Sequence, residues 1–140
     1  MPLAVYWLLT QMNTAEQPYD GFAGFSQGMQ TYHTLFKILK NFKKEMWLRH
    51  PLPSFTFDFS GSRWDQSTFE WTKGRFVEGN VFMSGVETLM YASPHDGVFD
   101  SCIRNSKAYE NPIFIEHDQG HRPPRSCSIN MGFSADFVVR

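Results

Sequence analysis

The chain has 140 residues without an internal repeat, which predicts one domain over residues 1–140 with a core of its own. Its hydrophobic content of 41% and aromatic content of 16% exclude a disordered chain. Its 13 basic and 14 acidic residues give a net charge of −1, so we expect no nucleic-acid partner and no attraction to an anionic membrane. Two isolated cysteines, Cys102 and Cys127, are typical of free thiols in a reducing compartment, which predicts a cytoplasmic protein.

The N-terminal stretch MPLAVYWLLTQM is apolar but short. It predicts a buried helix over residues 3–12, because a membrane span needs about 20 apolar residues and a secretory leader begins with basic residues. Pro18 and the pair Asp20-Gly21 then mark a turn. The run FAGF that follows, residues 22–25, is typical of a short strand buried on both faces.

Beyond Ser26, apolar residues recur every three or four positions, which predicts a helix with one apolar face from residue 29 to residue 46. A lysine row occupies the opposite face and is typical of a face in water. Pro51 and Pro53 end the helix. The apolar positions are Met29, Tyr32, Leu35, Phe36, Leu39, Phe42 and Met46, and the polar face carries Lys37, Lys40, Asn41 and Lys44.

The second half of the chain continues the alternation of strands and helices. Strands are predicted at 55–59, 86–93 and 111–117, and a helix at 98–109. Residues 61–84 are predicted to be a loop with a helical turn near 65–73, and the tail from residue 125 has no clear period. This order predicts an α/β fold with a mostly parallel sheet flanked by helices. Sites in such sheets form at the carboxyl ends of strands, where Ser26, Asp96 and the pair His117/His121 lie.

The stretch Gly24-Phe25-Ser26-Gln27-Gly28 has the Gly-x-Ser-x-Gly pattern between a predicted strand and a predicted helix. This pattern indicates a sharp turn that exposes a nucleophilic serine, with small residues that let the strand and the helix pass close together. The N–H of Gln27 would lie at the helix N-terminus, where it can bind an oxyanion. A serine nucleophile needs a base and an acid that orients the base, and Asp96 and His121 follow in the expected order. The alternative is a glycine-rich turn whose serine only caps a helix.

Four segments together resemble the FSH-type family of small serine hydrolases, a branch of the α/β-hydrolase superfamily. They are DGFAGFSQG at 20–28, FDFSG at 57–61, ASPHDGVF at 92–99 and HDQGHRPP at 117–124, so the resemblance covers about residues 15–124. It implies an abbreviated α/β-hydrolase fold and hydrolysis of a small carboxylic ester without a cofactor. It also implies Ser26 as nucleophile, Asp96 as acid and His121, not His117, as base.

The chain departs from the family pattern at three places. Gln119 replaces one glycine before the histidine, and Met29 and Gln30 replace small residues after the elbow. The motif begins already at Asp20, with no early strand and glycine-rich loop ahead of it. Gln27 is then the one recognisable oxyanion donor, and loss of a donor costs about 10²–10³ in rate. The elbow strand becomes an apolar edge, which a truncated product, a fragment or a homodimer covering the edge would each explain.

Three alternatives accompany this interpretation. Asp100 and Asp118 compete with Asp96 for the role of the acid, and His117 competes with His121 for the role of the base. A metal site is a second class, because nitrogen and oxygen donors gather here; we expect none, since no third ligand has a recognised spacing. A degenerate hydrolase domain that binds a ligand or a partner is the third. The metal donors are His95, Asp96, His117, Asp118 and His121, and the candidate interface aromatics are Trp64, Phe69, Trp71 and Phe76.

Overall fold

The structure is a computed structural model that describes residues 3–41, 47–61 and 83–123. The predicted order of helices and strands is confirmed. The predicted turn at 65–73, the predicted helical end at 42–46 and the aromatic positions between 64 and 76 lie outside the described residues. The elements are α1 (Leu3–Thr14), β1 (Gly21–Phe25), α2 (Gln27–Asn41), β2 (Phe55–Phe59), β3 (Glu87–Ala92), α3 (Phe99–Ser106) and β4 (Ile113–Glu116).

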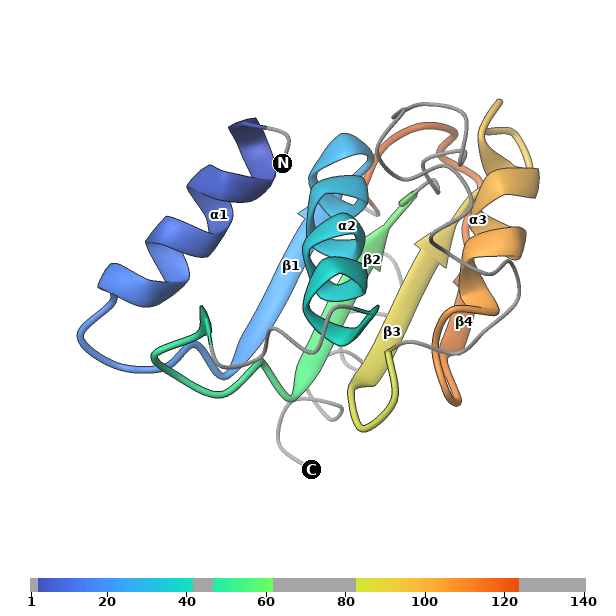
Figure 1. The fold of residues 1–140 in the computed structure, drawn as a ribbon. Helices are drawn as coiled ribbons and strands as arrows, with labels where there is room; N and C mark the ends of the chain where they lie inside the picture. Colours follow the sequence, from blue (N-terminus) through green and yellow to red (C-terminus); the bar gives the residue numbers. More distant parts are fainter. Residues whose placement is uncertain (1–2, 42–46, 62–82, 124–140) are drawn as a thin grey trace.

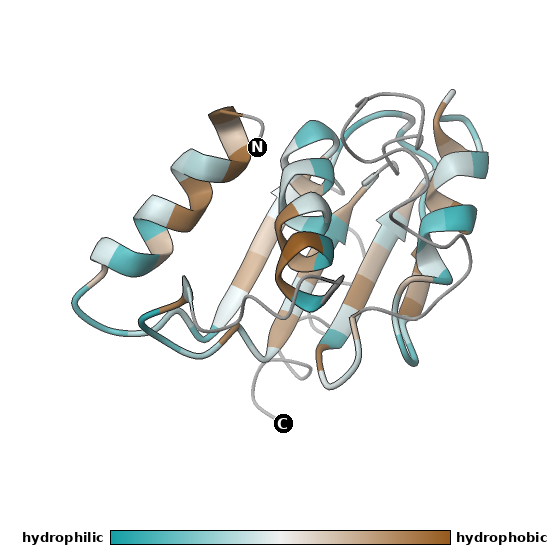
Figure 2. Cartoon of the chain, in the orientation of Figure 1, coloured by the Kyte–Doolittle hydropathy of each residue, from teal (hydrophilic) through white to brown (hydrophobic). Residues whose placement is uncertain are grey.

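The described strands form one parallel sheet in the order β1-β2-β3-β4, so the predicted fold class is confirmed. Phe25 at the end of β1 pairs with Phe59 at the end of β2, which pairs in turn with Tyr91 near the end of β3. The carboxyl ends therefore lie along one edge of the sheet, and the loops that follow β1, β3 and β4 meet there (Figure 1). Figure 2 shows that the strands are mainly apolar, whereas α3 is largely hydrophilic.

Buried and less buried residues alternate along β2, but the buried positions are the polar ones. The polar residues Thr56 and Asp58 are buried, and the phenylalanines between them are only half-buried. Asp58 is enclosed because His33 of α2 and Asn105 of α3 both reach it. Both helices therefore cover the same face of the sheet. The predicted period-two strand is correct, but its polar side is the one against the helices.

Helix α2 carries the packing between the sheet and α1. Its apolar face is buried as predicted, and Tyr32 stacks on Phe22 of β1 with ring centroids 3.9 Å apart. The prediction of a solvated lysine row is wrong for Lys37, which is buried, and correct for Lys40, which is exposed. Lys37 lies among residues of α2 that pack against neighbouring elements, so the sheltered part of the helix is wider than the apolar stripe indicates.

Helix α1 is buried on one face only, which corrects the prediction of a buried helix. Val5, Leu9 and Met12 pack against α2. The other face leaves large apolar side chains in water, and Leu3 is 83% exposed. The described helices include none that is both long enough and apolar enough to span a membrane.

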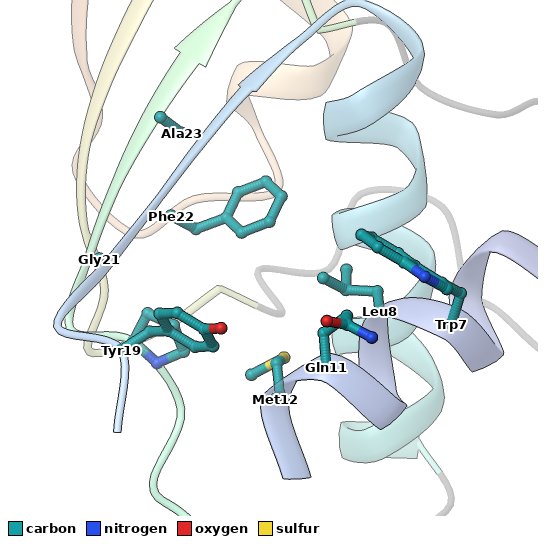
Figure 3. A pocket seen from close by; sticks show the side chains of 9 residues that line it. Trp7, Leu8, Gln11, Met12, Tyr19, Gly21, Phe22 and Ala23 are labelled. Atoms are coloured by element: carbon teal, nitrogen blue, oxygen red, sulfur yellow. The ribbon is translucent and has the colours of Figure 1, made fainter. Parts of the chain in front are cut away.

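Strand β1 is also less buried than predicted, since Ala23 and Phe25 are exposed. The physical reason is that β1 pairs with β2 alone among the described strands and so has a free edge. A pocket of about 290 Å³ lies between α1 and β1 (Figure 3). It lies against the beginning of β1, at the end opposite Ser26, and coverage of this edge by a second copy stays a prediction. The pocket is lined by Trp7, Leu8, Gln11, Met12, Tyr19, Gly21, Phe22, Ala23 and Pro53.

Candidate active site

Ser26 occupies a sharp turn between the last residue of β1 and the first residue of α2. Its φ of 50° lies in the left-handed region, which is strained for a residue with a side chain. The turn is held on both sides: the Ser26 N–H donates to the Phe59 carbonyl at 2.9 Å, and the Ser26 carbonyl accepts the Met29 N–H at 3.1 Å. The neighbouring strand and the first helical turn therefore maintain the strained conformation, as the Gly-x-Ser-x-Gly pattern predicts.

Close packing under the turn requires glycine at two positions. A Cβ on Gly24 would lie 2.5 Å from the Met29 sulfur, and one on Gly61 would lie 2.7 Å from Met29 Cβ. The sequence-based expectation that Gly28 serves the same purpose is wrong, because a Cβ there would meet no described atom within 4 Å. Met29, which departs from the small residues of the family pattern, thus fills the space that Gly24 and Gly61 leave.

His121 lies in the loop after β4 and links the other two predicted residues. Its Nε2 is 3.0 Å from Ser26 Oγ, and its Nδ1 is 2.6 Å from Asp96 Oδ2. A carboxylate can only accept, so the Nδ1–H donates to Asp96 and the free Nε2 lone pair accepts the Ser26 O–H. The imidazole side chain is 42% exposed, and its ring lies 4.8 Å from that of Phe25. The histidine side chain is therefore partly exposed to solvent.

Asp96 is sheltered and kept ionised. Burial raises the pKa of its carboxyl, but hydrogen bonds from the Val98 N–H and from His121, together with the Ser60 side chain, outweigh it and lower the pKa below its ordinary value. The Val98 N–H donates to Asp96 Oδ1 at 3.0 Å, which leaves Oδ2 directed at the imidazole. This arrangement fixes the histidine tautomer and stabilises an imidazolium.

The rival residues lie elsewhere within the described part of the chain. His117 Nδ1 accepts the Gln119 N–H at 3.2 Å, and burial lowers the pKa of this histidine. Asp100 lies in the first turn of α3, and Asp118 is the neighbour of His117. The bonds to Ser26 Oγ and to the imidazole Nδ1 come from His121 and Asp96 instead. In the described residues no three histidine, cysteine or acidic side chains gather closely enough to hold a metal ion.

Gln27 is the first residue of α2, so its N–H has no acceptor within the helix. It follows Ser26 directly and lies at the positive end of the helix dipole, where an oxyanion is stabilised. Residues 3–20, ahead of β1, form α1 and its connection to β1. The absence of an early strand and loop from this stretch, expected from the sequence, is thus confirmed for residues 3–20.

Sequence reasoning missed a second set of polar residues beside the turn. The Asp58 carboxylate accepts the Gly61 N–H at 2.7 Å on Oδ1, and the Tyr109 hydroxyl and the Asn105 amide on Oδ2. His33 Nε2 contacts the Tyr109 hydroxyl. The signal available was Asp58 itself, an acid within the aromatic strand FTFDF, but its partners come from distant segments.

A comparison with protein families decides the assignment. Residues 5–133 match the model of the family described as serine hydrolase (FSH1). The chain belongs to this family. The match extends beyond the stretch of about residues 15–124 on which the sequence resemblance rests. It includes Ser26, Gln27, Asp96 and His121.

Two solved structures share the fold of this family member. The crystal structure of Zea mays acyl-protein thioesterase 2 superposes with a TM-score of 0.62 at 16% identity, covering 96% of this chain and 62% of that one. Carboxyl esterase 2 from the mycorrhizal fungus Tuber melanosporum gives a TM-score of 0.55 at 18% identity, with 84% and 50% covered. The fold is thus a partial α/β-hydrolase fold, and the chain spans less than two thirds of either neighbour. No curated protein sequence matches the chain.

Proposed function

We propose that this chain is a serine hydrolase that cleaves a small carboxylic ester through Ser26, His121 and Asp96. The observation that carries the proposal is the continuous line of two hydrogen bonds, 3.0 Å from Ser26 Oγ to His121 Nε2 and 2.6 Å from His121 Nδ1 to Asp96 Oδ2. The family match and the esterase and thioesterase among the structural neighbours support the same class of reaction.

The reaction follows from these contacts. Ser26 Oγ forms a bond to the ester carbonyl carbon while His121 Nε2 accepts the serine proton, and the carbonyl oxygen becomes an oxyanion near the Gln27 N–H. The tetrahedral intermediate breaks its bond to the alcohol oxygen, which takes the proton from the imidazolium. An acyl-serine remains. A water molecule then gives a proton to His121 and attacks the acyl carbon, and the serine oxygen leaves with that proton as the carboxylic acid is released.

A fluorophosphonate probe tests the nucleophile directly. The probe phosphonylates a serine oxygen only where a base removes its proton, so we expect a single adduct on Ser26 of the folded protein. Ser26→Ala should abolish labelling. Ser54→Ala is the matched control, because the Ser54 hydroxyl donates to the Asp20 carbonyl at the opposite end of the sheet. Absence of an adduct on wild-type protein with an intact cooperative melt would contradict the proposal.

A second candidate function is a non-catalytic hydrolase-like domain that binds through the side of β1. The specific observation in its favour is the apolar pocket of about 290 Å³ between α1 and the free edge of β1 (Figure 3). Hydrolysis of p-nitrophenyl acetate separates the two candidates. Turnover that disappears in Ser26→Ala supports the enzyme, and absence of turnover by folded wild-type protein supports the binding domain.

A further inference from the structure

Two loops bring the acid and the base of the proposed triad together. The acid loop, residues 93–98, follows β3 and carries Asp96, and the base loop, residues 117–123, follows β4 and carries His121. Their strands are neighbours, with Ala92 paired to Glu116. Because each loop leaves its strand independently, the 2.6 Å contact between Asp96 and His121 depends on how the two backbones are held relative to each other.

Ser93 contacts the backbone on both sides of this gap. Its hydroxyl oxygen accepts the His95 N–H at 3.2 Å within the acid loop and the Gly120 N–H at 3.1 Å from the base loop. Its carbonyl accepts the Asp96 N–H at 2.9 Å. His95 and Gly120 are the residues directly before Asp96 and His121, so one side chain holds the backbone N–H of the residue that precedes each member of the acid–base pair.

The Ser93 hydroxyl is fully buried, and both of its acceptor sites are used by the two loops. Ser93 is 0% exposed, and its oxygen has two acceptor sites, which the two N–H groups occupy. Gly120 has a φ of 64°, a left-handed conformation that directs His121 back toward Ser26. Anchoring the N–H of that glycine therefore fixes the direction in which the base leaves its loop.

We propose that Ser93 is a positioning residue that ties the acid loop to the base loop and so sets the alignment of His121 between Asp96 and Ser26. The expected effect of Ser93 on kcat rests on the proposed function. It does not require Ser93 to touch the substrate, because the residue acts through the backbone next to Asp96 and His121.

Steady-state kinetics with p-nitrophenyl acetate measure this role. Ser93→Ala removes the shared acceptor, and a misplacement of the base by about 1 Å costs up to about a hundredfold in rate, so we expect kcat to fall by about tenfold to a hundredfold. KM should change by less than about twofold, because the alignment of the base matters in the transition state. Ser54→Ala should match the wild-type rate. A kcat for Ser93→Ala within about twofold of wild type would overturn the proposal.

A double-mutant cycle separates positioning from a general loss of structure. In an Asp96→Asn background the imidazole proton lies on Nε2 and His121 no longer acts as a base, so adding Ser93→Ala should change kcat by less than about twofold. The full single-mutant loss on top of Asp96→Asn would show that Ser93 acts by another route and would overturn the inference.

A spectroscopic readout keeps the inference distinct from the proposed activity. The proton in the short His121 Nδ1–H···Asp96 bond should give a downfield proton NMR signal in wild-type protein that Asp96→Asn removes. We expect Ser93→Ala to broaden or abolish this signal. If wild-type protein shows the signal but no turnover, the proposed function fails while the positioning role stands. If Ser93→Ala keeps a sharp signal at the wild-type position, the positioning role fails.

Ser93→Cys covers the case in which Ser93→Ala does not fold. The thiol is somewhat larger than the hydroxyl and is a weak acceptor, so no cavity is left while the two N–H bonds weaken. Its kcat should lie between those of Ser93→Ala and wild type, or about tenfold below wild type if alanine unfolds the chain. Wild-type turnover and a wild-type NMR signal in folded Ser93→Cys would contradict the proposal.

Discussion

Two buried aspartates, Asp58 and Asp96, lie near the turn at Ser26, and their surroundings shift their pKa values in opposite directions. Asp58 of β2 is 1% exposed and Asp96 after β3 is 7% exposed, but Asp58 lies deep beneath α2 and α3, whereas Asp96 lies in a loop beside the partly exposed His121. The pKa of Asp58 is raised to about 6, whereas that of Asp96 is lowered.

The difference in pKa has two causes, the depth of burial and the hydrogen-bond partners. Burial dominates at Asp58, and the hydrogen bonds from Tyr109, the Gly61 N–H and Asn105 offset its effect on the pKa only in part. Asp96 combines a backbone donor with a direct bond to His121, whose imidazole can carry a positive charge and reaches the solvent. At Asp58 the imidazole of His33 is 3.8 Å away and contacts Tyr109 instead. A carboxylate suited to a triad thus needs an imidazole bound directly to it.

The largest effect expected from this comparison is on the reaction. Asp96→Asn can donate to His121 Nδ1, which forces the imidazole proton onto Nε2 and removes the base, so kcat/KM should fall by about 10⁴. Asp58→Asn should lower kcat/KM by less than about tenfold, because that carboxylate does not touch the imidazole. Turnover of p-nitrophenyl acetate measures both. Equal losses in the two variants would contradict the division of roles.

The second-largest effect is expected on stability, because Asp58 and Asp96 should make the unfolding free energy depend on pH in opposite ways. The folded chain holds the Asp58 proton more tightly than the unfolded chain, so this residue stabilises the fold below about pH 4, and that contribution is lost as the pH rises through about 6. The rise from 3.8 to about 6 corresponds to about 3 kcal/mol. Asp96 contributes with the opposite sign: its stabilisation is present at neutral pH and is lost on acidification.

Urea unfolding at a series of pH values tests this contrast. The unfolding free energy of wild type minus that of Asp58→Asn should fall by about 3 kcal/mol between pH 4 and pH 7. The corresponding difference for Asp96→Asn should rise with pH instead, mainly below about pH 4, where the carboxyl of the unfolded chain titrates. Parallel curves for wild type and Asp58→Asn would show that Asp58 does not titrate in this window.

A smaller effect is expected at the hydroxyl that separates His33 from Asp58. Tyr109→Phe removes a donor to the buried carboxylate and should lower the unfolding free energy at pH 7 by about 2 kcal/mol. Tyr19→Phe removes an exposed hydroxyl and is the matched control, with almost no change expected. Turnover per folded molecule should be unchanged in both. A loss of turnover with unchanged stability in Tyr109→Phe would show that the hydrogen bonds around Asp58 contribute to the reaction rather than to stability.

Much of the candidate site could be predicted because its members follow local rules. Ser26 lies in a Gly-x-Ser-x-Gly pattern that follows a predicted strand and begins a predicted helix, and Asp96 and His121 each follow a strand of a parallel sheet, whose carboxyl ends must share an edge. Their order along the chain then leaves few arrangements. The choice of His121 over His117 came from the family pattern, and the structure brings His121 to Ser26 at 3.0 Å.

Other features could not be predicted because they depend on contacts between distant segments. The exposed face of α1 and the free edge of β1 reflect which elements are their neighbours, and hydrophobicity does not reveal that. Lys37 follows the helical period into a polar stripe and is buried nonetheless. Gly28 fits the motif, yet the space next to it is open.

The sequence by itself determined the order of helices and strands and the parallel sheet, because periodicity and turn chemistry act over a few residues. It also limited the candidates at the carboxyl edge of the sheet to Ser26, His117, His121 and the aspartates Asp96, Asp100 and Asp118. Only the tertiary structure decided which carboxylate meets an imidazole and which meets neutral donors, since Asp96 and His121 are 25 positions apart and Asp58 and Tyr109 are 51 apart. It also decided that the Ser93 hydroxyl joins the two loops. A pKa and a shared hydrogen bond are set by three-dimensional surroundings, and a linear pattern does not contain them.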